Sequence, residues 1–163
     1  MKVLLTGSNG QLGQALRLSL PKAIKGEPLE LIATSRKGGN GMMALDLGDR
    51  DACRAAVVEH RPDWVLNAGA YTAVDRAETD SQLAHRVNGE APRAFAEALL
   101  STGGRLLQVS TDFVFSGDQG HPYQPEQALA PLGVYGASKA AGEQAVGELL
   151  GLGVDGYGAI LRT

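Results

Sequence analysis

The sequence predicts an α/β domain, built on a doubly wound parallel sheet with helices on both faces. Short runs of leucines and β-branched residues alternate with longer helical patterns, and turn residues separate them. Several strand candidates are apolar throughout, which is typical of strands buried on both faces of a parallel sheet. A glycine-rich turn directly follows the first strand. Together these three observations predict the fold class.

We expect six strands alternating with four helices. The strands are predicted at Lys2–Thr6, Leu29–Thr34, Met42–Leu45, Trp64–Asn67, Arg105–Ser110 and Gly158–Arg162. The helices are predicted at Gln11–Leu20, Asp49–His60, Ser81–Ser101 and Val134–Leu150. Between Ser116 and Leu132 the glycines and prolines exclude a helix, so a long loop is expected before the last helix.

Length and composition are those of one globular domain. The chain has 163 residues, of which 44% are hydrophobic and 20% charged. With a net charge of -3 and scattered lysines and arginines, it lacks the basic stripe of a nucleic-acid-binding protein. Neither a bilayer-spanning run nor a signal peptide is visible, so we expect no membrane partner and a cytoplasmic location. The single cysteine, Cys53, is expected in the core, and the dispersed histidines do not suggest a metal site.

The first turn has glycines at three-residue intervals, namely Gly7, Gly10 and Gly13. A tight strand-to-helix turn that must also approach a pyrophosphate requires residues without a Cβ atom. The helix N-terminus then offers free N–H groups and a partial positive charge to phosphates. Because a strand precedes the turn and a helix follows it, we predict a dinucleotide site in a Rossmann-type domain. The alternative is a purely structural tight turn.

The end of the second strand should distinguish the two nicotinamide cofactors. No carboxylate is present there to bind a ribose 2′-hydroxyl, whereas Ser35, Arg36 and Lys37 could all bind a 2′-phosphate. NADPH is therefore favoured and NADH is the alternative. The competing interpretation is that Arg36 and Lys37 are only solvated loop charges.

Two later segments are candidates for the same cofactor. Asp46, followed by Leu47, could meet the adenine amino group or cap the next helix, although Asp49 is better placed for capping. After the fourth strand, small residues would allow the backbone to pass close to a ligand. They are Ala68, Gly69 and Ala70.

Tyr135 and Lys139 lie four residues apart on the last predicted helix and therefore on one face. A phenol with a pKa of about 10 is a poor acid–base catalyst at neutral pH, but an ammonium one turn away would lower that pKa. The small residues between them, Gly136 and Ala137, would let cofactor and substrate approach. Thr111 follows the fifth strand, where open α/β sheets bind ligands, so its hydroxyl and Tyr135 could converge on one carbonyl oxygen. The alternative is an ordinary surface pair.

Three segments carry a more specific resemblance. They read NAGAYTAVD at 67–75, STDFVFSG at 110–117 and PLGVYGASK at 131–139. With the glycine turn, they resemble the dTDP-4-dehydrorhamnose reductase family of the extended short-chain dehydrogenase/reductase superfamily. The similarity covers essentially the whole chain.

The resemblance implies roles for individual residues. The three turn glycines would cradle the pyrophosphate, lined by Asn9, Gln11 and Leu12. Thr111 would hydrogen-bond the 4-keto oxygen, Tyr135 would donate its proton, and Lys139 would orient the nicotinamide ribose and lower the phenol pKa. NADPH would reduce C4 of dTDP-4-dehydro-L-rhamnose, giving dTDP-L-rhamnose.

Family members continue past position 163 with a further strand and a smaller lobe that binds the nucleotide-sugar. The resemblance thus implies that residues 1–163 are the NAD(P)-binding domain without that lobe. We expect the chain to bind NADPH but to turn over nucleotide-sugar poorly. Two alternatives remain open: a sugar-nucleotide epimerase of the same superfamily, and a non-catalytic NADP-binding regulatory subunit. A homodimer also remains open.

Overall fold

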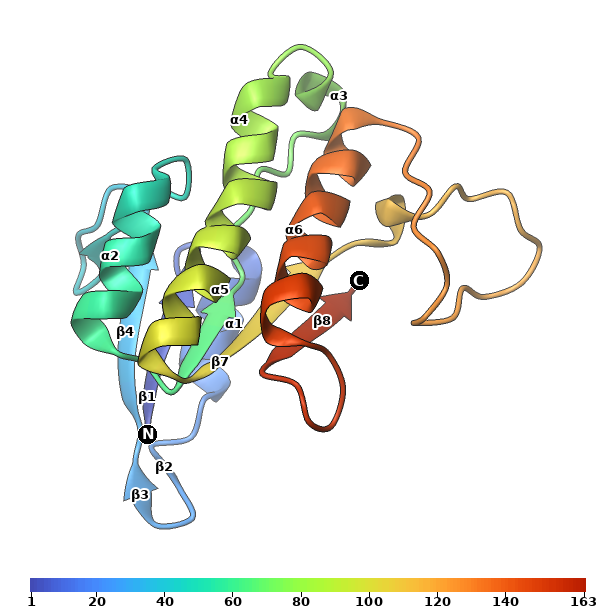
Figure 1. Ribbon diagram of the computed structural model, residues 1–163. Coiled ribbons are helices and arrows are strands. Elements are labelled where there is room, and N and C mark those ends of the chain that lie inside the picture. Colours follow the sequence, from blue (N-terminus) through green and yellow to red (C-terminus); the bar gives the residue numbers. More distant parts are fainter.

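The computed structural model describes residues 1–163 and contains a six-stranded parallel sheet (Figure 1). The strand order is β5-β4-β1-β6-β7-β8. The strands are β1 (Lys2–Thr6), β4 (Glu30–Ser35), β5 (Met43–Ala44), β6 (Trp64–Asn67), β7 (Arg105–Ser110) and β8 (Gly158–Arg162). The chain adds strands on one side of β1 and then returns to its other side. The carboxyl ends of β1 and β6 therefore flank the switch point, where such sheets bind ligands.

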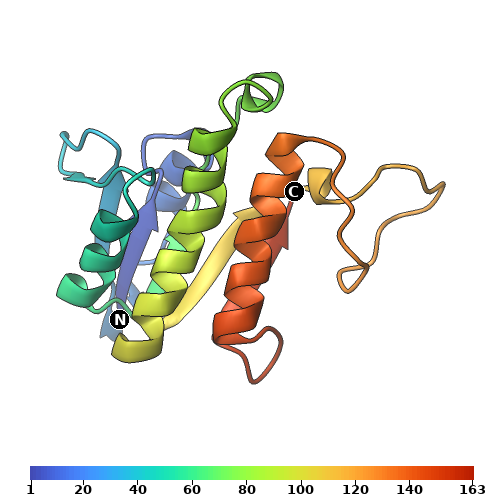
Figure 2. The same ribbon diagram turned by 45° about the horizontal axis from the view of Figure 1, so that its top comes forward.

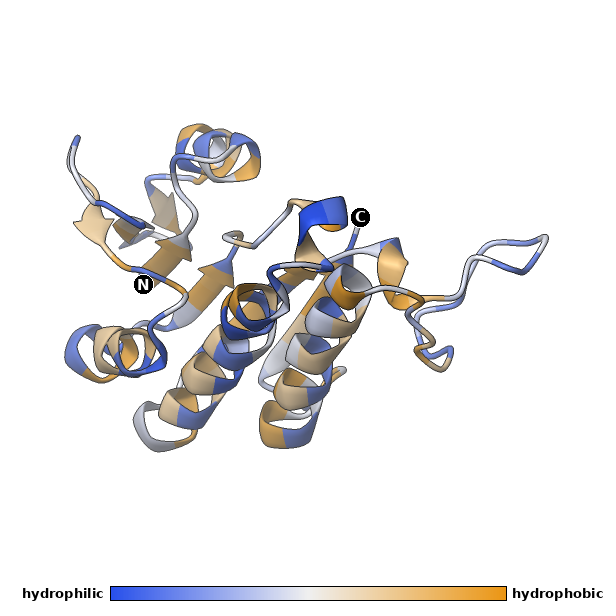
Figure 3. Ribbon diagram, turned by 90° about the horizontal axis from the view of Figure 1, so that it is seen from above, coloured by the Kyte–Doolittle hydropathy of each residue, from blue (hydrophilic) through white to orange (hydrophobic).

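Helices cover both faces of the sheet, as predicted. Seen from above, α1 lies on one face and three longer helices lie on the other (Figure 3). The bounds are Gln11–Ser19 for α1, Arg50–His60 for α2, Ala91–Thr102 for α5 and Val134–Leu150 for α6. None of these helices is long and apolar enough to cross a membrane.

The main core lies between the sheet and the face formed by α2, α5 and α6. Its 15 buried residues include Leu4 on β1, Val57 on α2, Phe95 on α5 and Val146 on α6. Cys53 is fully buried in the same cluster, which confirms the sequence prediction. Burial raises the pKa of its thiol to about 12, so this cysteine is unreactive at neutral pH.

Several short elements were not predicted from the sequence. A small hairpin joins β2 (Ala23–Ile24) to β3 (Glu27–Pro28), and two single turns appear as α3 (Val74–Ala77) and η2 (Asp112–Val114). The hairpin turns at Lys25 and Gly26, which both have positive φ. Such short elements produce no periodic pattern. The loop between Ser116 and Leu132 does extend from the body of the domain, as Figure 2 shows.

The predicted helix at Ser81–Ser101 is divided into three segments. These are α4 (Ser81–His85), a π-helical turn η1 (Arg86–Glu90), and α5. Within η1, the buried Asn88 side chain accepts a hydrogen bond from the Tyr71 backbone N–H (2.9 Å) and donates one to the Tyr71 carbonyl (3.0 Å). This tertiary contact accompanies the wider turn, which hydrophobic periodicity cannot reveal.

Candidate functional site

The glycine turn after β1 is held by close approaches of backbone to backbone. Gly7 has φ of +63°, and a Cβ atom there would lie 2.6 Å from the Gly69 Cα. A Cβ atom on Gly13 would lie only 2.2 Å from the Gly7 carbonyl oxygen. A Cβ atom on Gly10 would lie 3.2 Å from the Gly7 carbonyl oxygen, so this position is the least restricted of the three. Gly7 and Gly13 are therefore sterically required.

The N-terminus of α1 has the character of an anion site. Gly10 is its N-cap and provides no side-chain hydrogen bond, and the first turn contains no acidic residue. Its free N–H groups and the positive end of the helix dipole are left for an external partner. These features fit the pyrophosphate of a dinucleotide.

A cavity of about 350 Å³ opens beside this turn. Seven of the predicted cofactor residues line it: Gly7, Asn9, Arg36, Asp46, Leu47, Gly69 and Ala70. They come from the ends of β1, β4, β5 and β6, which are far apart in the sequence. Arg36 takes part in no ion pair, so its guanidinium is available to an anionic ligand.

The other predicted cofactor residues do not line this cavity. Ser35 is buried and its hydroxyl donates to the Gly38 carbonyl (3.4 Å), so it is directed into its own turn. Gln11 and Leu12 are exposed on α1. Gly10, Gly13 and Ala68 also lie outside the lining. Asp46 accepts a hydrogen bond from the Gly48 N–H, while Asp49 caps α2, as predicted.

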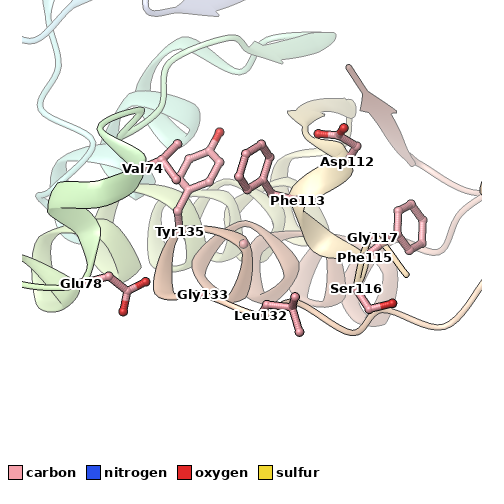
Figure 4. Close-up of a pocket in the computed structure, with 11 residues that line it drawn as sticks. Val74, Glu78, Asp112, Phe113, Phe115, Ser116, Gly117, Leu132, Gly133 and Tyr135 are labelled. Carbon is pink, nitrogen blue, oxygen red and sulfur yellow. The ribbon is translucent and has the colours of Figure 1, made fainter. Parts of the chain in front are cut away.

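A second cavity, of about 270 Å³, lies against the N-terminal end of α6. Figure 4 shows Tyr135 and Phe113 side by side in it, with Glu78 to one side and Asp112 to the other. The two rings meet edge to face, with centroids 5.6 Å apart. Tyr71 lines the first cavity and Val74 the second, so the segment between β6 and α3 runs between them.

Thr111 lies next to this second cavity at the carboxyl end of β7. Its side chain is buried, accepts a hydrogen bond from the Phe113 N–H (3.2 Å) and donates one to Asp112 (3.1 Å). Burial raises the pKa of Tyr135, the Thr111 hydroxyl lowers it by hydrogen bonding, and the Asp112 charge raises it. The structure therefore brings Thr111 and Tyr135 together, as the sequence predicted.

Lys139 does not lower the pKa of Tyr135, as the sequence predicted it would. Its ammonium donates to the Val109 carbonyl (2.6 Å), and the pKa of Tyr135 is raised rather than lowered. The reason is burial, which affects both groups. It lowers the pKa of Lys139 to about 8, while Glu143 acts in the opposite direction.

Gly136 has a different reason to be small than the one expected. A Cβ atom there would lie 2.2 Å from the Phe113 carbonyl oxygen. The glycine therefore allows η2 to pack closely on α6, and through this contact it places Phe113 beside Tyr135.

Comparison with known proteins agrees with this geometry. Residues 1–157 match the family model described as "RmlD substrate binding domain". The chain belongs to this family. It is 44% identical to the dTDP-4-dehydrorhamnose reductase of Streptomyces griseus over 98% of its own length and 48% of that protein. It thus spans about half the length of the curated relatives it matches.

Solved structures show the same fold. The dTDP-4-dehydrorhamnose reductase of Bacillus anthracis, solved in complex with NADP, has a TM-score of 0.82 and 35% identity. The match covers 99% of this chain and 52% of that one. The UDP-glucose 4-epimerase of Thermus thermophilus, solved with NAD, has a TM-score of 0.73 and 25% identity, covering 99% and 54%.

In this member of the RmlD family, a buried polar row runs from Gly69 in the first cavity to Lys139 on α6. The Gly69 N–H donates to the Thr6 hydroxyl (3.0 Å), which donates to the Asn67 amide oxygen (2.5 Å). The Asn67 amide nitrogen donates to Gln108 (2.6 Å), whose own amide donates to the Val109 carbonyl (2.7 Å). That carbonyl also accepts from Lys139.

Sequence reasoning missed this row and several residues of the first cavity. Thr6, Asn67 and Gln108 lie in predicted strands, and the sequence does not indicate that their side chains bond to one another, although all three are buried. Leu45, Tyr71, Leu83 and Val87 complete the cofactor-side cavity. A polar residue inside a predicted buried strand was the available signal for the row, because buried polar groups need partners. No comparable signal marked the cavity residues.

Proposed function

We propose that residues 1–163 form an NADP-binding domain whose cofactor occupies the cavity beside the glycine turn. The single observation that carries this proposal is the convergence of seven predicted residues on that cavity. The open N-terminus of α1 would hold the pyrophosphate, and Arg36 would bind a 2′-phosphate. Asp46 would face the adenine end. The relative solved with NADP supports the preference for NADPH over NADH.

We further propose that the chain contributes the acid–base residues of a carbonyl reductase. When bound, the cofactor would supply the hydride. Because its pKa is raised, Tyr135 stays protonated at neutral pH and would donate that proton to a substrate carbonyl oxygen. Thr111 would donate a hydrogen bond to the same oxygen as negative charge develops. Lys139 would bind the nicotinamide ribose.

The proposed reaction is reduction of the 4-keto group of dTDP-4-dehydro-L-rhamnose to dTDP-L-rhamnose. The names of the relatives support it, and so does the cavity beside Tyr135. A nucleotide-sugar is thus the proposed substrate. Homodimer formation and cytoplasmic location remain predictions, and sedimentation velocity would test the first.

A fluorescence titration with NADPH and NADH tests the cofactor proposal. We expect tighter binding of NADPH, and we expect Arg36→Gln to remove that preference while leaving NADH affinity unchanged. Lys22→Gln, at an exposed position, is the matched control for the lost charge. Equal affinity of the wild-type chain for the two cofactors would contradict the role of Arg36.

The second candidate function is epimerisation, which the structural match to UDP-glucose 4-epimerase favours. A reductase consumes NADPH in proportion to product, whereas an epimerase returns the cofactor to its starting state. A chain of the relatives' full length is incubated with NADPH and the keto-sugar, and separately with NAD and a nucleotide-sugar that carries a C4 hydroxyl, while absorbance at 340 nm is followed. Inversion of the C4 hydroxyl with no net change in absorbance, and no NADPH oxidation with the keto-sugar, would favour the epimerase.

A further inference from the structure

Two charged side chains of the chain are buried, and they lie one helical turn apart. They are Lys139 and Glu143, each 4% exposed, on the central part of α6. Every other acidic or basic residue keeps more contact with solvent. Residues four apart on a helix lie on the same face, about 5–6 Å apart at Cβ. A buried cation therefore has a buried carboxylate as its neighbour.

Arg162, on the edge strand β8, holds this carboxylate. The Arg162 guanidinium donates from Nε to Glu143 Oε1 (3.0 Å) and from Nη2 to Oε2 (2.7 Å), a two-point contact that fixes the carboxylate plane. The same guanidinium donates from Nη1 to the Pro125 carbonyl (2.8 Å) and lies 5.0 Å from the centroid of the Phe115 ring. Arg162 is thus anchored on both sides and cannot easily release Glu143.

Lys139 has no comparable partner. Its one hydrogen bond is to the uncharged Val109 carbonyl, which the Gln108 amide already shares. On its own helix, Tyr135 lies one turn before it and Glu143 one turn after it. Glu143 is thus the only carboxylate buried with it.

Charged groups on the other elements packed against α6 lie at or near the surface. On η1, α5 and η2 they are Arg86, Glu90, Arg93, Glu97 and Asp112. On α3, α4 and β7 they are Asp75, Arg76, His85 and Arg105, and Glu78 directly follows α3. Arg93 and Glu97 are engaged with Glu148 and with Arg50. None of them replaces Glu143 as the counter-charge of Lys139.

We propose that Glu143 is a positioning residue that keeps the buried Lys139 protonated, and that Arg162 holds Glu143 in place for this task. Burial alone favours a neutral amine, and a nearby carboxylate favours the ammonium. The pKa of Lys139, about 8, is the balance of these two effects. The proposal deepens the proposed function and rests on it, because it gives Lys139 the positive charge that its assigned role requires.

The pKa of Lys139 can be measured without any cofactor. The chain has only five lysines, so 13C labelling of lysine gives few Cε signals, and Lys139→Met identifies the relevant one. We expect the wild-type signal to titrate near pH 8. In Glu143→Gln its midpoint should fall by roughly one pH unit, because the stabilising charge is lost. Glu143→Asp keeps the negative charge, so its Lys139 midpoint should stay close to that of the wild type.

A structural role for the pair predicts a different result. If Glu143 and Arg162 only join α6 to β8, Glu143→Gln lowers the free energy of unfolding and leaves the Lys139 midpoint unchanged. That outcome overturns the proposal. Glu148→Gln is the matched control, since it removes an exposed carboxylate of the same helix that pairs with Arg93. It should leave the midpoint in place.

A second variant covers the case in which Glu143→Gln does not fold. Replacing both members of a buried ion pair by apolar residues is often neutral or stabilising. The double variant Glu143→Met/Arg162→Met should therefore fold and show a fall in the Lys139 midpoint, smaller than in Glu143→Gln because the Arg162 cation is also removed; an unchanged midpoint again overturns the proposal. Titrating the wild-type chain with NADPH separates this result from the proposed function. Absence of NADPH binding contradicts the function, while the lysine titration tests Glu143 independently.

Discussion

The glycine turn after β1 and the Tyr135–Lys139 turn of α6 are both short sequence motifs, but different forces hold them. In the first, neighbouring backbone atoms lie so close to Gly7 and Gly13 that a Cβ atom on either residue would clash with them. The second consists of side chains whose protonation depends on burial and on neighbouring charges. Residue type alone therefore specifies the geometry of the first. In the second it specifies the participants but not their charge state.

The largest effect on the free energy of unfolding is expected at the glycine turn after β1. In Gly13→Val the new side chain meets the Gly7 carbonyl and the Ser8 backbone, which cannot move without breaking the turn. We expect a loss of roughly 3 kcal/mol in the free energy of unfolding, measured by urea denaturation. Gly10→Ala is the control and should cost much less, because its Cβ atom would meet only one backbone oxygen, at 3.2 Å. Equal losses of unfolding free energy in the two variants would show that steric contact does not hold this turn.

For the Tyr135–Lys139 turn of α6 we expect instead that stability depends on pH. Between the folded-state pKa of Lys139, about 8, and its ordinary value of 10.5, the unfolded chain binds more protons than the folded one. The Lys139 contribution to the free energy of unfolding therefore rises with pH across this window. Below it, the buried charge costs up to about 3 kcal/mol.

Lys139→Met should remove this dependence and be more stable than the wild type at pH 7. Urea denaturation at pH 7 and pH 10 measures it. If the variant shows the same rise between these pH values, another group causes it and the assignment to Lys139 is wrong.

The buried row between the two regions should show an intermediate effect. Gln108→Leu leaves the Asn67 amide without its acceptor inside the sheet, and we expect a loss of about 2 kcal/mol. In Asn67→Leu/Gln108→Leu the unsatisfied amide is itself removed, so the loss should be smaller than the sum of the single variants. Simple additivity in this cycle would show that the row does not act as a unit.

The Tyr135 phenol allows a finer test of the Tyr135–Lys139 turn. Asp112→Asn should lower its pKa and Thr111→Val should raise it, since Asp112 disfavours the phenolate and the Thr111 hydroxyl favours it. Absorbance titration at 295 nm follows the four tyrosines, and Tyr135→Phe identifies the signal. Shifts of the same sign in both variants would contradict the assigned causes.

The smallest effect is expected on the solvent side of α6. Arg93 and Glu148 pair at 3.3 Å, but Glu148 is mostly exposed. Glu148→Gln should change the free energy of unfolding by no more than about 0.5 kcal/mol, and the change should shrink further in salt. A larger effect would show that surface charges on α6 matter as much as the buried ones.

The sequence predicted the six strands of the sheet, the loop before α6 and the turn glycines, because each depends on local pattern or backbone sterics. It also predicts a catalytic role for Thr111, Tyr135 and Lys139 from a strand end and from helical spacing, and this role stays a prediction. It did not reveal the π-helical turn at Asn88, which depends on a contact with Tyr71. Ser35 was assigned to the cofactor from its position alone, and only the folded turn directs it inward.

The sequence alone thus predicted the strand and helix pattern, the glycine turn at Gly7, Gly10 and Gly13, and the candidate catalytic side chains. The tertiary structure decided which cavities they line and which charges they carry. The raised pKa of Tyr135, the lowered pKa of Lys139 and the contact between Arg162 and Glu143 all depend on burial. Burial results from the packing of elements distant in sequence, so no local pattern contains it.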